Sequence, residues 1–292
     1  MTARRRLVRV PASSANLGPG YDVLAAALSL HLELEVSESA EFRVDAGGLA
    51  VPEDRSNLCV RAFERLHSAD GLRFEIRSQF PAAAGLGASA AAIVAGLMAA
   101  EHLYELAVER EELLAHAAEL EGHPDNVAAA LYGGFVICSR DGDTPRAARF
   151  DPPEGVEAVV VIPDDTVLTE DARRAIPAEI PLADAIGNVA AASLLVLGVQ
   201  RSDLTLIERG LADRIHQPRR AHLYPRSAEL VARAPELGAI GATISGAGPS
   251  VLVWTFWQNT GNVVEALREH TDGWAEVRRA PFSPLGADVP EL

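Results

Sequence analysis

Residues 81–92 read P-A-A-A-G-L-G-A-S-A-A-A, a glycine-containing turn followed directly by small residues that favour a helix. Gly85 and Gly87 allow the backbone to turn tightly and to approach a bound group closely. A helix that begins near Ser89 would direct its unpaired N–H groups and the positive end of its dipole at the turn. This arrangement binds anions, above all phosphate groups, although one such turn is weak evidence.

Two other stretches have a similar composition. Residues 11–22 read P-A-S-S-A-N-L-G-P-G-Y-D and follow a predicted strand, and residues 241–250 read G-A-T-I-S-G-A-G-P-S as a ten-residue connection between two predicted strands. Each could be an ordinary turn, since Gly, Pro, Ser and Asn are the usual turn residues. A simple turn needs fewer of them, so we interpret the three stretches together as loops around one ligand.

The composition excludes several classes of protein. The chain has 292 residues, 48% hydrophobic and 23% charged, which suits a globular protein of one large or two smaller domains. Its formal net charge of −15 argues against a nucleic-acid partner. All 26 basic residues are arginine. The lysine of a Walker A loop, of a protein kinase or of a Schiff-base enzyme is therefore absent.

The cysteines and the apolar segments predict a cytoplasmic location. Cys59 and Cys138 are far apart in the sequence, which favours reduced thiols. No apolar segment follows the arginines at 4–6, so no signal peptide is expected. The small-residue apolar run near 90–100 is too short to span a bilayer. We therefore expect no membrane partner.

Periodicity predicts an α+β fold, because strands come early in alternating pairs and helices cluster in the middle of the chain. The predicted strands are 7–10, 31–36, 72–76, 134–139, 157–162, 239–244, 251–254 and 275–279. The predicted helices are 57–68, 88–105, 109–121, 183–197, 204–215 and 263–270. Polar residues at 141–153 suggest a boundary between domains at 1–155 and 156–292.

Polar residues gather after the helix predicted at 109–121. Glu121 lies in its last turn, where a carboxylate opposes the helix dipole and needs a compensating cation, either an arginine or a metal ion. His123, Asp125 and Asn126 follow at once, and Asp125 could simply cap the next helix.

Two further polar segments lie in the second half of the chain. Thr169 and Arg173 are four residues apart at the start of another predicted helix, and Arg220 ends the segment H-Q-P-R-R. An isolated arginine is usually structural, so these residues alone predict no chemistry.

A dinucleotide-binding protein is the weaker interpretation of the glycine-rich turns. Gly246 and Gly248 lack a third glycine, since Val251 stands at that position. Gly85 and Gly87 do have Ala90 at the third position, but no acidic residue ends a following strand about 20 residues later. A nicotinamide-dependent dehydrogenase is therefore disfavoured.

Taken together, the loops resemble those of the GHMP small-molecule kinases over nearly the whole chain, most closely in the branch that phosphorylates homoserine. Residues 11–22 are similar to the N-terminal motif of that branch, with Tyr21 where phenylalanine is commoner. Residues 81–91 resemble the family's phosphate loop and residues 241–250 its third motif. E-G-H-P-D-N-V at 121–127 and T-E-D-A-R at 169–173 are more specific to the homoserine branch.

The resemblance implies a two-domain fold, with a left-handed β-α-β unit in an N-terminal ATP-binding domain and a ferredoxin-like C-terminal domain. It implies ATP and Mg²⁺ as cofactors and, as in most of the family, a homodimer. Asn57 would contact the nucleotide base, and Ser89 and Glu121 would bind Mg²⁺. The implied nucleotide-binding residues are Asn57, Pro81, Gly85, Leu86, Gly87, Ala88, Ser89 and Ala90.

The implied substrate residues are Asn16, Asp22, His123, Asp125, Asn126, Thr169, Arg173 and Arg220. Their chemistry suits homoserine, because Asp22 or Asp125 can hold an ammonium group and arginines a carboxylate. Asn126 would orient the hydroxyl group, and Asn126, Asp125, Ser89 and Glu121 form the expected catalytic set. With no lysine present, the aspartate–lysine pair of some relatives is impossible, and the resemblance implies a hydroxyl activated without a dedicated base.

One departure leaves alternatives open. Ala88 stands where the family usually has a serine, and we expect a modest loss of nucleotide affinity from the missing hydroxyl group. The alternatives are a nucleotide-binding regulatory protein of the same fold with little kinase activity, or a kinase for another small alcohol.

Overall fold

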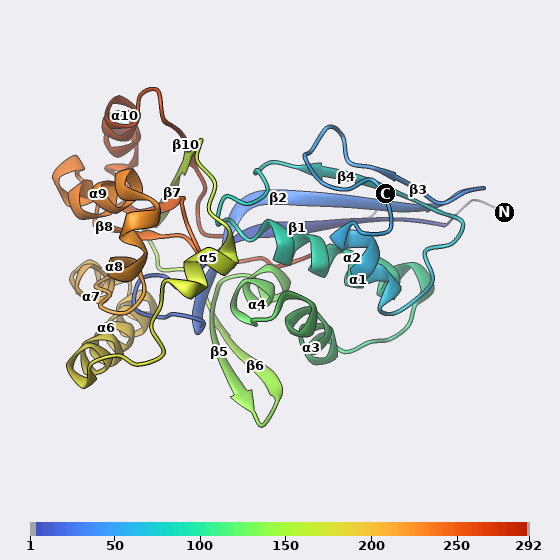
Figure 1. Ribbon diagram of the computed structural model, residues 1–292, viewed down its shortest axis with the longest axis horizontal. Helices are drawn as coiled ribbons and strands as arrows, with labels where there is room; N and C mark the ends of the chain where they lie inside the picture. Colours follow the sequence, from blue (N-terminus) through green and yellow to red (C-terminus); the bar gives the residue numbers. More distant parts are fainter. Residues whose placement is uncertain (1–3, 291–292) are drawn as a thin grey trace.

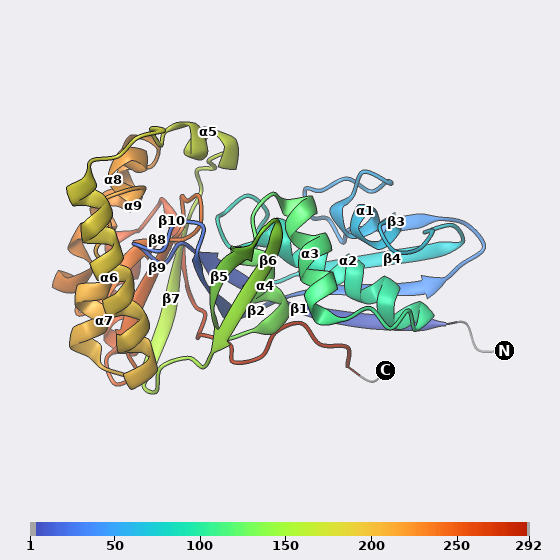
Figure 2. The same cartoon turned by 90° about the horizontal axis from the view of Figure 1, so that it is seen from below.

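The computed structural model describes residues 4–290, which form two α+β units side by side (Figures 1 and 2). The first unit is built on a six-stranded sheet of order β3-β4-β2-β5-β6, with β1 paired to β2. Its strands are β1 (Arg5–Ala15), β2 (Leu24–Glu38), β3 (Arg43–Asp45), β4 (Leu72–Ser78), β5 (Phe135–Asp141) and β6 (Thr144–Phe150). Its helices are α1 (Leu58–Glu64), α2 (Ala88–Tyr104), α3 (Arg110–Glu121) and α4 (Asp125–Tyr132).

The small residues of α2 let this helix lie at the centre of the first unit. It packs against β1, β2, α1, α3 and α4, and its residues from Ala90 to Ala100 are buried except Ala92. A Cβ atom at Gly96 would lie 2.1 Å from the carbonyl oxygen of Cys59, so the contact with α1 requires glycine at this position. The position of the α2 N-terminus is therefore set by packing on several sides.

The second unit has a four-stranded antiparallel sheet of order β10-β7-β9-β8. In chain order this is 4-1-3-2, the ferredoxin-like arrangement that the resemblance implies. The strands are β7 (Val156–Pro163), β8 (Gly241–Ile244), β9 (Val251–Phe256) and β10 (Ala275–Arg279). The helices are α5 (Thr169–Arg174), α6 (Leu182–Arg201), α7 (Leu204–Gly210), α8 (Gln217–Arg220), α9 (Pro225–Arg233) and α10 (Thr260–His270), with short 3₁₀ turns at Ala221–Leu223 and Ala234–Leu237.

After β10 the chain returns to the first sheet. Bridges join Phe282 to Leu28 and Asp288 to Arg9, and the Arg9 guanidinium also pairs with the Asp288 carboxylate at 2.8 Å. The predicted division into 1–155 and 156–292 separates the two sheets at β7. It did not foresee that the end of the chain lies against the N-terminal sheet.

Several element boundaries differ from the predicted ones. β1 continues through Ala15, so the first five residues of the motif at 11–22 are strand rather than loop, because Ala12–Ala15 pair with the small residues of β2. β8 (Gly241–Ile244) lies within the strand predicted at 239–244, so the connection to β9 has six residues, and the first four residues of the motif at 241–250 are strand. The predicted boundary segment at 141–153 contains β6, which forms a hairpin with β5. The predicted helix 204–215 ends at Gly210.

Among the described residues, one helix, α6, is long and apolar enough to cross a membrane by length and composition alone, with a mean hydropathy of 1.8. The apolar run near 90–100, which the sequence singles out, lies instead in the shorter helix α2. In the structure α6 packs closely along α7, since a Cβ atom at Gly210 would lie 2.5 Å from the backbone nitrogen of Leu195.

Candidate active site

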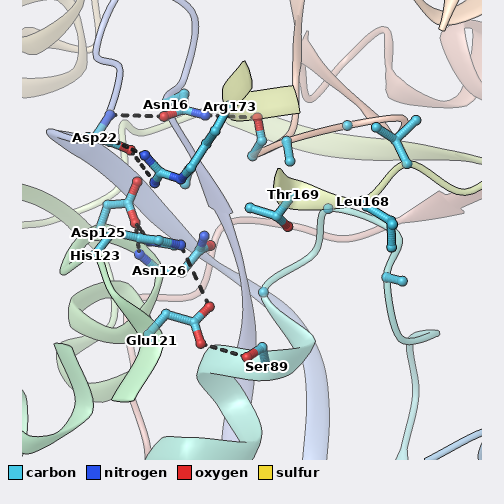
Figure 3. Close-up of a pocket in the computed structure, with 18 of the residues that line it drawn as sticks. Asn16, Asp22, Ser89, Glu121, His123, Asp125, Asn126, Leu168, Thr169 and Arg173 are labelled. Atoms are coloured by element: carbon cyan, nitrogen blue, oxygen red, sulfur yellow. Dashed lines mark hydrogen bonds and ion pairs between the residues drawn. The ribbon is translucent and has the colours of Figure 1, made fainter. Parts of the chain in front are cut away.

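The glycine-rich turn lies at the start of α2, beside β1 and the β8–β9 connection (Figure 3). Gly85 and Gly87 have φ angles of +77° and +68°. A Cβ atom would lie 2.4 Å from the Ser245 carbonyl oxygen at Gly85, and 2.1 Å from the Ser13 hydroxyl oxygen at Gly87. No side chain caps the helix. The first N–H groups of α2 therefore face a polar pocket with no partner from their own helix, as anion binding requires.

Glu121, at the end of α3, points at the same helix start (Figure 3). The hydroxyl group of Ser89 donates a hydrogen bond of 2.6 Å to its carboxylate. The nearest cationic candidate is the His123 imidazole, whose Nε2 is 3.8 Å away. Burial raises the pKa of Glu121 above its ordinary value, more than Ser89 and His123 lower it. Of the two compensating cations that the sequence left open, an arginine or a metal ion, no arginine forms an ion pair with Glu121 within residues 4–290.

His123, Asp125 and Asn126 form a connected group at the start of α4. The His123 Nδ1 atom lies 2.6 Å from the Asp125 carboxylate, which also accepts a hydrogen bond from the Asn126 backbone N–H. Burial lowers the pKa of His123, but the hydrogen bond and charge of Asp125, with Glu121, outweigh it and raise the pKa overall. Asp125 is the first residue of α4 rather than its N-cap, which is Pro124.

The orientation of the Asn126 amide is set by β1. The Ser13 hydroxyl group donates a hydrogen bond of 2.8 Å to Asn126 Oδ1. The Nδ2 group of Asn126, which carries the two hydrogen-bond donors, is thereby turned away from Ser13, and Asn126 lines the pocket between Asp125 and Ser89 (Figure 3). Ser13 was not among the predicted site residues, although it stands in the motif at 11–22.

At the opposite end of the pocket, Arg173 of α5 forms a bidentate ion pair with Asp22, with nitrogen–oxygen distances of 2.9 and 3.0 Å (Figure 3). The hydrogen bond and charge of Asp22 raise the pKa of Arg173. Asp22 was expected to bind the ammonium group of an amino acid and Arg173 its carboxylate. In this structure the two side chains bind each other.

Arg220 is 2% exposed, and its Nε donates a hydrogen bond of 2.7 Å to the carbonyl oxygen of Ala172. In the described part of the chain no carboxylate lies within ion-pair distance of it. A buried guanidinium without an acidic partner is costly unless an anion completes its environment.

The structure brings most predicted site residues to one pocket. Those lining it are Asn16, Asp22, Gly85, Gly87, Ala88, Ser89, Glu121, His123, Asp125, Asn126, Thr169, Arg173 and Arg220. Asn16 also links two loops, because its Nδ2 donates to the Gly246 carbonyl oxygen at 2.8 Å and its Oδ1 accepts from the Asp22 backbone N–H.

Four predicted nucleotide residues do not line this pocket. Leu86 and Ala90 are buried in the core, and Pro81 is exposed. Asn57 is the N-cap of α1: its side chain accepts from the Cys59 N–H and donates to the Pro52 carbonyl oxygen. The predicted contact with the nucleotide base is therefore not supported by the orientation of this amide.

Some pocket residues were not predicted as site residues. They are Ala15, Tyr21, Ala83, Val167, Leu168, Gly246, Ala247 and Gly248. Tyr21, Gly246 and Gly248 stand in the motifs at 11–22 and 241–250, so the sequence could have indicated them as site residues. Val167 and Leu168, the apolar residues before α5, belong to no such motif.

Comparison with known protein families identifies the class of the molecule. The model of the GHMP kinase N-terminal domain matches residues 57–134, and that of the GHMP kinase C-terminal domain matches residues 194–275. The chain belongs to the GHMP kinase family, and the predicted two-domain α+β fold is confirmed.

The relatives within this family have a more specific activity in their names. The homoserine kinase of Moorella thermoacetica is 39% identical over 256 residues, which cover 85% of this chain and 86% of that protein. The homoserine kinase of Clavibacter michiganensis is 42% identical over 264 residues, covering 86% and 83%. The crystal structure of homoserine kinase from Cytophaga hutchinsonii has a TM-score of 0.88 at 30% identity, covering 99% of this chain and 98% of that one.

Proposed function

We propose that this protein is a homoserine kinase, which transfers the γ-phosphoryl group of ATP to the side-chain hydroxyl of L-homoserine with Mg²⁺ as cofactor. The observation that carries the proposal is one pocket with a helix N-terminus and a buried carboxylate at one end and a group of arginine and aspartate side chains at the other. The names of its relatives support the same activity.

The phosphate end suits a metal-bound triphosphate. Backbone N–H groups at residues 87–89 offer hydrogen bonds to phosphate oxygens, and the helix dipole favours their negative charge. Ser89 and Glu121 supply two hard oxygen ligands 2.6 Å apart, the type that Mg²⁺ prefers, together with water and substrate phosphates. When bound, Mg²⁺ neutralises charge on the transferring phosphoryl group.

The other end suits an amino acid. Arg220 is a buried cation that lacks an acidic partner, and Arg173 lies near it across Tyr21. Both guanidinium groups match the geometry of a carboxylate. Asp22 and Asp125 are the carboxylates available for the ammonium group, and the proposal leaves open which of them binds it.

Asn126 lies between the two ends and is the residue that we expect to orient the hydroxyl group. Asn126 lines the pocket, and its Nδ2 group is turned away from Ser13, which holds its Oδ1. His123 is hydrogen-bonded to Asp125, and its raised pKa means that a larger share of the imidazole already carries its proton and cannot accept another. Catalysis by this chain therefore depends on positioning and charge neutralisation, which phosphoryl transfer chiefly requires.

The direct test incubates the purified protein with ATP, Mg²⁺ and L-homoserine and detects O-phosphohomoserine by phosphorus NMR and mass spectrometry. We expect product with homoserine and none with mevalonate or galactose. Phosphorylation of a control alcohol alone would assign the protein to another branch of the family. Tight ATP binding without any product would favour the regulatory alternative, for which the Ala88 substitution is the only sequence feature.

We also propose that the protein is a cytoplasmic homodimer. Both cysteines are buried free thiols, which supports a reducing compartment. The exposed face of α6 bears Leu182, Ile186 and Val189, which are 75%, 61% and 69% exposed. An uncharged apolar face is self-complementary about a two-fold axis. Sedimentation velocity should give a dimer for the natural chain and a monomer for Ile186→Asp; a monomeric natural chain would contradict this.

A further inference from the structure

Tyr21 is held between the two arginines at the amino-acid end of the pocket. Its hydroxyl oxygen accepts hydrogen bonds from Arg173 Nη1 at 3.2 Å and from Arg220 Nη2 at 3.4 Å. The two guanidinium carbons lie 5.8 and 5.0 Å from the centre of its ring, and the ring also contacts that of His216 at 5.5 Å. The phenol is therefore fixed on several sides.

The hydrogen bonds of this hydroxyl group are incomplete. A phenol oxygen can accept two hydrogen bonds and donate one. The two arginines use both acceptor positions, and among residues 4–290 no acceptor receives the O–H proton. Burial, followed by the charge of Asp22, raises the pKa of Tyr21, so the proton is retained at neutral pH. Tyr21 lines the pocket, where a ligand is the remaining partner.

Two neighbouring cations polarise the hydroxyl group and make it a better donor. The partner that suits it is an anion with two oxygens, which can accept from the phenol and from a guanidinium together. We infer that Tyr21 is a substrate-binding residue that donates its O–H hydrogen bond to the α-carboxylate of the amino acid. This inference rests on the proposed function. It adds the Tyr21 hydroxyl group to the two arginines as a third group that binds the carboxylate.

The competing explanation is that the hydroxyl group only holds the two arginines in place. The two roles differ in their dependence on the substrate carboxylate. 3-Aminopropan-1-ol is homoserine without its carboxylate, and it keeps the ammonium and the hydroxyl group. If the hydroxyl group donates to the carboxylate, its removal should lower kcat/KM for homoserine and not for 3-aminopropan-1-ol. If it only maintains the shape of the pocket, its removal should lower kcat/KM for both alcohols.

The experiment compares the natural chain with Tyr21→Phe, which removes one oxygen atom. Tyr132→Phe is the matched control, because its hydroxyl group lies outside the pocket and contacts the Arg110 carbonyl oxygen at 3.3 Å. For each protein, kcat and KM are measured with homoserine and with 3-aminopropan-1-ol, and KM is measured for ATP. Circular dichroism and melting temperature establish that the variants are folded.

We expect Tyr21→Phe to lower kcat/KM for homoserine by roughly tenfold or more, the loss of one hydrogen bond to a charged group. The effect should appear in KM, while kcat/KM for 3-aminopropan-1-ol and KM for ATP stay within about twofold. Equal losses for the two alcohols, or no loss for either, would overturn the assignment of Tyr21 alone. If the natural chain forms no phosphohomoserine, the proposed function fails and the assignment fails with it.

Discussion

The two ends of the pocket are built by different means. The phosphate end uses backbone N–H groups of one contiguous turn, residues 85–89, and the position of α2 holds them in place. The proposed amino-acid end has side chains from four segments: the loop after β1, α4, α5 and α8. Its charged groups already interact with one another, since Asp22 pairs with Arg173 at 2.9 Å.

The two ends therefore differ in how much their own groups must rearrange when a ligand binds. Under the proposed function, a triphosphate would meet donors that are already in place, so little reorganisation would oppose its binding. An amino acid would instead have to break the Asp22–Arg173 ion pair, with its ammonium binding Asp22 and its carboxylate binding Arg173. The two side chains are 35% and 38% exposed, so the pair is partly solvated and its loss costs no more than about 1 kcal/mol. The following predictions test this contrast, from the largest effect to the smallest.

Glu121→Gln should have the largest effect, because it removes the buried charge at the phosphate end. We expect kcat/KM at millimolar Mg²⁺ to fall on the order of 100-fold, the usual loss when one preorganised charged or polar group is removed from a phosphoryl or acyl transfer site. Glu119→Gln on the same helix is the control, since Glu119 is 62% exposed and pairs with Arg65 at the surface. An unchanged Mg²⁺ requirement in Glu121→Gln would remove Glu121 from the metal site.

The Mg²⁺ requirement should also depend on pH. Burial raises the pKa of Glu121, so its protonated form persists to higher pH than in an ordinary glutamic acid. Only the deprotonated carboxylate binds Mg²⁺. As the pH falls through this raised pKa, the half-saturating Mg²⁺ concentration should rise by up to about tenfold per pH unit. The same slope in Glu121→Gln would assign the dependence to another group.

Asp22→Asn tests the amino-acid end. We expect KM for homoserine to rise roughly tenfold, because Arg173 loses its charged partner and the ammonium group loses a candidate carboxylate. KM for ATP should change less than about twofold, since the phosphate end does not use this residue. Asp171→Asn is the control: Asp171 pairs with Arg174 on the exposed side of α5. Equal changes in both KM values would mean that the two ends are not independent.

Ser13→Ala tests the link between β1 and Asn126. Without the hydrogen bond to Oδ1, the amide can rotate, and we expect kcat to fall about fivefold with a smaller change in KM. A double-mutant cycle with Asn126→Ala separates positioning from folding, because removing Ser13 should have little further effect when Asn126 is absent. Additive losses in kcat would contradict the positioning role.

Asn57→Ala should have the smallest effect on activity. Its side chain caps α1, so the free energy of unfolding should fall by about 1 kcal/mol, as measured by urea denaturation. KM for ATP should remain unchanged, because the amide is occupied by Cys59 and Pro52. If KM for ATP rises while the free energy of unfolding is unchanged, the result would instead support the predicted contact between Asn57 and the nucleotide base.

The glycine-rich turn at the proposed phosphate end was predictable from the sequence because it is one contiguous segment of backbone. Gly85, Gly87 and the small residues after them define the turn and the helix start wherever the rest of the chain lies. Glu121 followed from its position in a last helical turn, but the sequence left open whether an arginine or a metal ion lies beside it, and the structure places Ser89 and His123 there.

The amino-acid end was only partly predictable. Asp22 and Arg173 are 151 residues apart, and local patterns do not reveal that they pair. The continuation of β1 was missed because Ser13 and Ser14 favour turns; buried pairing with Ala27 and Ala26 overrides that preference. For Asn57 the predicted contact with the nucleotide base stays a prediction, because the motif places the residue in the chain but does not reveal that its amide caps α1.

The return of the chain after β10 makes the second unit an insertion within the first. Ser29 and Ser283 donate backbone hydrogen bonds to Pro281 and Ala27, and Asp288 exchanges backbone hydrogen bonds with Arg9. Two covalent passages, before β7 and after β10, therefore join the units (Figure 2). Two tethers define an axis and exclude a free swivel, so any opening of the crevice between the units is a hinge movement about that axis.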